Sequence, residues 1–132
     1  MTTAYTVAQF VDRNNIRLAC DWAENNPNMA DNMNHWRCVL KCDRRQMTFY
    51  FSQGYGIAND PDLESVLDCL ASDASGYENA RSFEEWADEY GYDTDSRKAE
   101  RTYHAVAKQS AALKRVLGDD LYETLLWNTE RY

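Results

Sequence analysis

The chain has 132 residues, of which 44% are hydrophobic and 13% aromatic, and its formal net charge is −8. This length and composition predict a single folded domain over residues 1–132 and exclude a disordered acidic tail, because enough apolar surface is available to form a core. No stretch approaches the roughly 18 apolar residues of a membrane span, and the N-terminus lacks the features of a leader, so we expect a cytoplasmic protein without a membrane segment.

The first predicted elements are a helix and a strand. Residues 6–14 have Thr6 as a candidate cap and apolar residues spaced by three and four, which indicates a short helix that ends at Asn14-Asn15. Over residues 16–23 the apolar period changes to two, with Ile16, Leu18, Cys20 and Trp22 on one side. That alternation is typical of a half-buried strand.

A β-hairpin is predicted next. The Asn-rich segment 25–34 favours a loop, and residues 35–42 and 45–52 both alternate apolar and polar side chains. The short polar connection Asp43-Arg44 joins them, so the two strands should pair. Residues 54–59, with two Gly and an Asn, indicate a second loop.

The remainder of the chain predicts four helices. Asp60-Pro61 resembles a cap followed by a first-turn proline, and residues 63–70 carry one apolar stripe before a break at 72–76. Ser82 and Glu85 have the spacing of a capping box, which begins a short helix that should bury one face and end at Gly91. The buried face should hold Phe83, Trp86, Ala87 and Tyr90.

The two last helices complete the expected fold. The longest should run over residues 95–117 and end at Gly118, and the last over 119–129, with Leu121, Tyr122 and Leu125 facing inward. The order of helix, three strands and four helices predicts an α+β fold, with a small three-stranded antiparallel sheet packed against a cluster of four to five helices.

The four cysteines do not indicate a metal site. His35, Cys38 and Cys42 are spaced as candidate ligands, but two residues four apart on a strand lie about 13 Å apart, too far for one zinc ion. Because the chain lacks a secretory signal, reduced thiols are the favoured state of Cys20, Cys38, Cys42 and Cys69, with disulfides and metal binding as the alternatives.

Signals for catalysis are weak. The chain has two histidines, His35 and His104, and no Gly-rich phosphate loop, nucleophile elbow or zinc-protease motif. His104 flanks the long predicted helix, and His35 lies at the start of a strand. We therefore expect a protein that is not an enzyme and that uses no cofactor.

A dense acidic segment stands out along the chain. Residues 59–95 hold twelve carboxylates and one base, Arg81, a local charge of about −11. The four carboxylates at 84, 85, 88 and 89 fall on one helix face, along about 8 Å of the helix axis. Their spacing of about one charge per 2 Å is close to the one charge per about 1.7 Å of duplex DNA. The candidate partner-binding residues are Glu64, Asp68, Glu84, Glu85, Asp88 and Glu89. The alternative is a merely solvated acidic face.

A basic ridge follows in the longest helix. Residues 96–115 hold six Lys or Arg against Glu100, and four of the six fall within about 40° on the face opposite the core. The ridge consists of Arg97, Arg101, Lys108 and Arg115. It could contact phosphates or an acidic surface, or it could be solvated or paired with neighbouring carboxylates.

Five segments of the chain carry a resemblance to known proteins. They are residues 51–54, 66–73, 82–86, 90–99 and 117–118. In these segments the chain resembles small proteins encoded by bacteriophages and other bacterial mobile elements, over residues 35–126. That group has no known common activity, so the resemblance implies no functional residue. By analogy it implies a context, because small acidic phage proteins are often inhibitors of host defence, including anti-CRISPR and anti-restriction proteins, some of which imitate DNA.

The sequence thus leads to one main hypothesis. A phage or mobile-element protein would bind, through its acidic surface, a host protein or ribonucleoprotein effector with a basic surface and inhibit it stoichiometrically. Direct nucleic-acid binding is disfavoured by the net charge. The alternatives are an accessory nucleic-acid-binding protein that uses the basic ridge and a homodimer in which acidic and basic surfaces pair.

Overall fold

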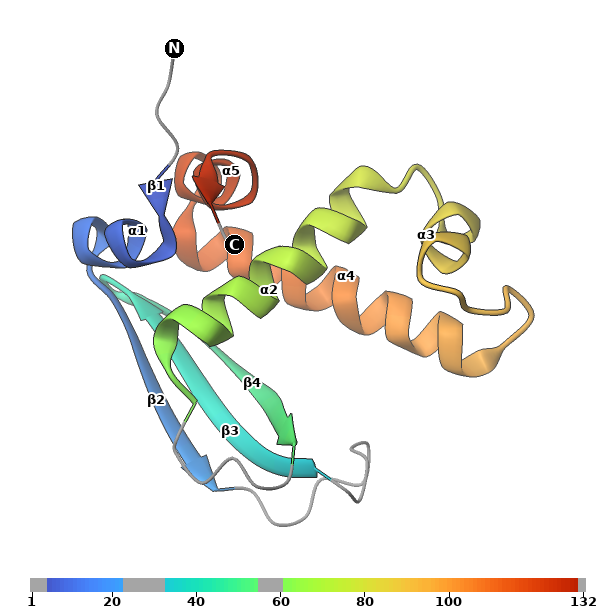
Figure 1. Cartoon of the computed structure of the whole chain (residues 1–132), viewed down its shortest axis with the longest axis horizontal. Helices are drawn as coiled ribbons and strands as arrows, with labels where there is room; N and C mark the ends of the chain where they lie inside the picture. Colours follow the sequence, from blue (N-terminus) through green and yellow to red (C-terminus); the bar gives the residue numbers. More distant parts are fainter. Residues whose placement is uncertain (1–4, 23–32, 55–60, 131–132) are drawn as a thin grey trace.

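The computed structural model describes residues 5–22, 33–54 and 61–130. These residues form an α+β fold, as the sequence predicts, in which helices cover one face of an antiparallel sheet (Figure 1). Its elements are β1 (Tyr5–Thr6), α1 (Val7–Asn14), β2 (Ile16–Trp22), β3 (Met33–Cys42), β4 (Arg45–Gly54), α2 (Leu63–Asn79), α3 (Phe83–Glu89), α4 (Arg97–Leu117), α5 (Asp119–Trp127) and β5 (Thr129–Glu130).

The first helix is fixed at both ends by side chains and backbone conformation. Thr6 and Gln9 form a reciprocal capping box, in which each side chain accepts a hydrogen bond from the other residue's backbone N–H. Asn15 has a left-handed backbone with φ of 51°, which ends the helix and turns the chain into β2. The predicted cap and stop are both confirmed.

The sheet has the strand order β2-β3-β4, and its two strand pairs are antiparallel. Cys42 pairs with Arg45 across the two-residue turn, which confirms the predicted hairpin. Alternate side chains of β3, including Cys38, Leu40 and Cys42, are fully buried under the helices, while Arg37 and Lys41 point to the exposed face. Both strands of the hairpin extend into the predicted loops, because Met33 and Asn34 belong to β3 and Gly54 ends β4. The rest of the predicted loops at 25–34 and 54–59 lies outside the described residues.

A parallel pairing of the two chain ends was not predicted. Tyr5 pairs with Thr129 and Thr6 with Glu130, which joins β1 to β5 beside α1 and α5. Strands of two residues are too short to show an alternating pattern in the sequence. Only the tertiary structure, which brings the end of the chain beside α1, creates this pair.

The second helix corrects two sequence predictions. Its cap is Asp62 rather than Asp60, because Asp62 accepts hydrogen bonds from the backbone N–H and the hydroxyl of Ser65 at 2.9 and 2.8 Å. The predicted break at 72–76 is wrong, since α2 continues to Asn79. The small residues Ala74 and Ser75 are buried in this stretch, and they allow α2 to pack closely on α4 instead of ending the helix.

The Asp62 cap gives a first testable prediction. Asp62→Ala should lower the free energy of unfolding by about 1 kcal/mol, because Ser65 loses its hydrogen-bond acceptor. The hydrogen bonds from Ser65 also lower the pKa of Asp62 below its ordinary value of 3.8. A lowered folded pKa means that the stabilisation is present above pH 3.8 and is lost as the pH falls through the folded value.

Chemical denaturation at several pH values measures both effects. Asp62→Asn is the matched control, because an amide oxygen still caps the helix but does not titrate in this range. If Asp62→Ala unfolds at the same denaturant concentration as the wild type, the cap assignment is wrong.

The helix boundaries after α2 differ in detail from the predictions. The hydroxyl of Ser82 accepts a hydrogen bond from the N–H of Glu85 at 3.2 Å, but the Glu85 carboxylate accepts from the N–H of Arg81, so only half of the predicted capping box forms. Ser96 caps α4, which begins two residues later than predicted. The last helix, α5, ends at Trp127.

The buried residues form a main core and a smaller cluster. The main core lies between the sheet and helices α1, α2, α4 and α5, and it includes Phe10, Leu40 and Leu125. Trp86, Ala87 and Ala99 are also buried, yet they do not belong to that core. None of the described helices has both the length and the apolar composition needed to cross a membrane.

Candidate functional site

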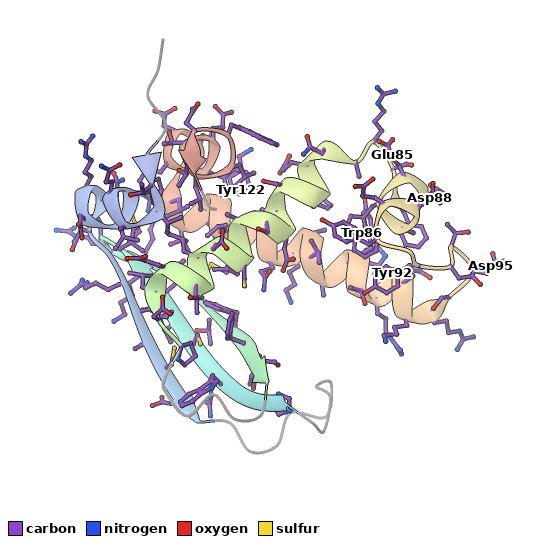
Figure 2. The ribbon with its side chains drawn as sticks, in the orientation of Figure 1. Glu85, Trp86, Asp88, Tyr92, Asp95 and Tyr122 are labelled. Atoms are coloured by element: carbon purple, nitrogen blue, oxygen red, sulfur yellow. The ribbon has the colours of Figure 1, made fainter. Side chains whose placement is uncertain are left out.

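The acidic helix α3 lies at the end of the molecule away from the sheet, next to the C-terminal part of α2 and the N-terminal part of α4 (Figure 1). In Figure 2, Trp86 and Tyr92 lie between α3 and α4, while Glu85 and Asp88 project from α3 into solvent. One side of α3 is therefore an anchor, and the other is a carboxylate-rich surface.

The anchor is a cluster of aromatic rings around Trp86, which is 3% exposed. The Trp86 ring stacks on Tyr92 with centroids 5.3 Å apart, and Tyr103 of α4 meets it edge-on at 5.2 Å. Phe83 meets the same Tyr103 ring at 5.2 Å. These distances are typical of favourable aromatic pairs, so the cluster holds α3 in a fixed orientation on α4.

The outer face of α3 holds four of the six predicted partner-binding residues. Glu84, Glu85, Asp88 and Glu89 are all exposed. Within the described part of the chain, none of them has a Lys, Arg or His nitrogen within 4.0 Å. These four residues form the acidic face of α3. No basic side chain among the described residues therefore pairs with their charge.

The other two predicted residues do not join the acidic face. Glu64 lies in the first turn of α2 and is exposed, whereas Asp68, one turn later, is half-buried. About 11 residues of helix, roughly 16 Å at 1.5 Å per residue, separate Asp68 from the end of α2 near α3. The six candidates therefore divide into two separate groups, and only the acidic face is continuous.

A cavity of about 450 Å³ opens between α2 and α3. Its lining includes the acidic-face residues Glu85 and Glu89, the Tyr90 side chain and hydroxyls of α2. Tyr90 was predicted to be buried, but it is 47% exposed because α3 ends at Glu89 and Tyr90 occupies the cap position. Its hydroxyl lies where a Cβ at Gly76 would have to be, so the absence of a side chain at Gly76 lets the Tyr90 ring contact α2.

A second, smaller cavity of about 170 Å³ lies on the other side of Tyr90. Asp73 of α2 lines it together with Trp86, Tyr90 and Tyr92. Partial desolvation raises the pKa of the Asp73 carboxyl above its ordinary value, and it also raises the pKa of Tyr90, with the negative charge of Asp73 contributing. Together with the acidic face, these groups make this end of the molecule favourable for a positive charge.

The basic ridge is exposed along its whole length, and no residue of it has a carboxylate within 4.0 Å in the described parts of the chain. Its ends have different surroundings. Lys108 and Arg115 line a cavity of about 500 Å³ with Met47 and Phe49 of β4, whereas Arg97 and Arg101 precede Tyr103, which contacts α3. Arg97 and Arg101 thus belong to the part of α4 that lies next to α3 (Figure 1).

The remaining candidate groups are scattered. His35 Nδ1 lies 3.2 Å from the Ser52 hydroxyl on the neighbouring strand, and His104 pairs at 3.8 Å with Glu100 on an exposed part of α4. Among the residues that the structure describes, no three His, Cys, Asp or Glu side chains gather as a metal site would require.

Sequence reasoning missed the contributions of Asp73, Tyr90 and Tyr92 to this end of the molecule. Asp73 fell in the predicted helix break, and Tyr92 follows α3 without any helical periodicity. The small residues on both sides of Asp73, at 71–72 and 74–76, were the available signal, because close helix packing explains them as well as a helix break does.

The chain was compared with models of known protein families, with curated proteins and with solved structures. None of the three comparisons finds a match. The functional assignment must therefore rest on the surface chemistry described above.

Proposed function

We propose that this chain is a non-enzymatic inhibitor encoded by a phage or mobile element, which binds a basic surface of a host nucleic-acid-handling complex through the acidic face of α3. The class of partner is a defence effector of the CRISPR or restriction type, located in the bacterial cytoplasm. The observation that carries the proposal is an ordered helix face of four exposed carboxylates that form no ion pair with any basic side chain in residues 5–22, 33–54 and 61–130.

Rigidity supports this role. A charged loop would lose conformational entropy on binding, whereas α3 is already fixed by the ring contacts of Trp86 with Tyr92 and Tyr103. The carboxylates are therefore held in one arrangement before a partner arrives. A fixed row of negative charges is the feature by which a protein surface can compete with a DNA backbone for a basic channel.

The cavity between α2 and α3 adds a contact of a different kind. A Lys or Arg side chain from the partner could enter beside Glu85 and Glu89 and approach the exposed Tyr90 ring. Such a cation would gain from charge pairing and from the aromatic face together. The partner chemistry that fits this end of the molecule is thus a basic protein surface.

A direct test measures competition with DNA. Purified CRISPR effectors carrying their guide RNA, and restriction enzymes, would each be mixed with labelled target DNA and increasing amounts of the chain. The proposal expects that one effector releases its DNA at close to one chain per complex, and that inhibition weakens as salt rises. If no effector in either class is inhibited at low salt, the proposal of a DNA-competing inhibitor is wrong.

The basic ridge supports a second candidate, an accessory nucleic-acid-binding protein. Its specific observation is that Arg97, Arg101, Lys108 and Arg115 are exposed and have no carboxylate within 4.0 Å among the described residues. The main proposal expects no shift of duplex DNA or RNA by the chain in a mobility-shift assay at low salt. A shift that disappears in a variant with Gln at these four positions would instead support the second candidate.

A homodimer is a distinguishable third outcome. Because neither the acidic face nor the basic ridge forms ion pairs within the part of the chain that the structure describes, two copies could pair these surfaces, and such a dimer would dissociate as salt rises. Sedimentation of the chain at low and high salt measures this without any partner. A dimer at low salt in which the acidic face is covered would count against its use as a docking surface.

A further inference from the structure

Two cysteines of the sheet, Cys20 and Cys38, have sulfur atoms that lie unusually close together for two free thiols. Cys20 of β2 and Cys38 of β3 are directly opposite in the register of the antiparallel pair. Their sulfur atoms are 3.0 Å apart. Unbonded carbon atoms prefer about 3.5 to 4.0 Å, and sulfur is larger than carbon, so this separation lies between non-bonded contact and a disulfide of about 2.05 Å.

We propose that Cys20 and Cys38 are a redox-active pair that closes into a cross-strand disulfide in the presence of a disulfide oxidant. The backbone already fits the bond. Residues directly opposite on antiparallel strands have Cα atoms about 4.5 to 5.5 Å apart, and disulfides span Cα separations of about 4.4 to 6.8 Å. Closure therefore requires rotation of two side chains rather than movement of the strands.

The reaction is a thiol–disulfide exchange with glutathione disulfide as the oxidant. The Cys20 thiolate attacks one glutathione sulfur, forms a mixed disulfide and releases one glutathione thiolate. The Cys38 thiolate then attacks the Cys20 sulfur and releases the second. Two electrons pass from the cysteines to the oxidant, and the two thiol protons end on the two glutathione thiols.

Exposure and acidity assign the order of these steps. Cys20 is half-buried and can meet the oxidant, whereas Cys38 is fully buried. Burial, with the neighbouring Cys20 thiol contributing, raises the pKa of Cys38 well above its ordinary value. Its thiolate is therefore scarce, so the second step should limit the rate and should accelerate as the pH rises.

The other two cysteines provide internal controls. Cys42 lies opposite Ile16 and its Sγ is 3.6 Å from the Asn14 carbonyl oxygen, so it has no cysteine across the strand pair. Cys69 is exposed on α2 and is available for a mixed disulfide with glutathione. A pairing reaction can thus be separated from simple modification of an accessible thiol.

A closed bond would change the stability of the sheet. It would join the edge strand β2 to the central strand β3 and close a loop from residue 20 to residue 38. Cross-linking of this kind raises stability chiefly by restricting the unfolded chain. The oxidised protein should therefore melt at a higher temperature than the reduced protein, and reduction should reverse the shift.

The experiment incubates the purified full chain with glutathione disulfide at pH 7 and pH 9, quenches it with acid, and alkylates the remaining thiols in denaturant. Mass spectrometry of non-reduced peptides should show one intramolecular link between Cys20 and Cys38, with the loss of two hydrogen masses and faster closure at pH 9. The wild type and Cys69→Ser should both show the link, and both should melt at a higher temperature after oxidation.

Two variants should lack the link. Cys20→Ser changes the half-buried partner, and Cys38→Val replaces the buried thiol by an apolar side chain of similar size, so a folding defect in one does not remove the test. The proposal is overturned if the oxidised wild type carries only glutathione adducts, with Cys38 still recovered as a free thiol. It is also overturned if the linked peptide involves Cys42 or Cys69 instead.

Discussion

Replacing Trp86 with Ala is expected to lower the free energy of unfolding at the α3 end of the molecule by about 3 to 5 kcal/mol. The side chain is 3% exposed and lies against Phe83 of α3, two Tyr rings of the segment after α3 and Tyr103 of α4. Its removal leaves these rings without a common partner. Among the Trp side chains that the structure describes, Trp36 belongs to the main core and Trp127 is exposed, so only Trp86 is buried outside the main core.

The loss should be local, because Trp86 does not belong to the main core. Amide hydrogen exchange of the variant should show strongly reduced protection over residues 83–103 and unchanged protection of Leu40 and its neighbours in β3. Such separate opening is expected where a small cluster packs at the end of a larger fold. Uniform loss of protection would show instead that the two clusters unfold as one unit.

Trp127→Ala is the matched control for this prediction. It removes the same side chain from a position that is 52% exposed at the end of α5. Its effect should stay within about 0.5 kcal/mol, as for other surface substitutions. Comparable losses in the two variants would contradict the anchoring role of Trp86.

The DNA-competition test is expected to identify one inhibited effector. Neutralising the acidic face should weaken the inhibition of that effector on the order of 30-fold. The variant is E84Q/E85Q/D88N/E89Q. Exposed charge pairs are worth about 0.5 kcal/mol each, and four of them correspond to roughly 2 kcal/mol, where 1.4 kcal/mol is tenfold in affinity. The fold should remain intact, because all four side chains are exposed and none forms an ion pair with the rest of the described chain.

A second variant separates position from net charge. Asp12, Asp21, Asp120 and Glu123 are exposed on other elements. Changing them to Asn or Gln also moves the net charge from −8 to −4, since −8 plus 4 gives −4. Inhibition should change much less in this control than in the acidic-face variant, measured as the concentration that halves DNA binding. Equal losses would mean that overall charge, and not the acidic face, determines binding.

The cysteines of β2 and β3 show what the spacing of residues within one strand can establish. Residue spacing along β3 correctly placed Cys38 and Cys42 on one face of the strand, and the structure shows that this face is buried. The spacing gave no indication that Cys20 faces Cys38, since that contact depends on the register between β2 and β3. Register is set by turn geometry and by the whole buried face of the sheet, so it is a property of the folded chain.

The sequence by itself determined the α+β class, the hairpin around Asp43-Arg44 and the exposure of the acidic face, because alternation, helical periodicity and caps are local signals. Tertiary packing decided that α2 continues past Ser72, that Tyr90 is exposed and that Glu64 and Asp68 lie apart from α3. Each of these depends on contacts between residues far apart in the chain. The sequence shows which residues are charged, but their grouping into a surface depends on how α2, α3 and α4 pack together.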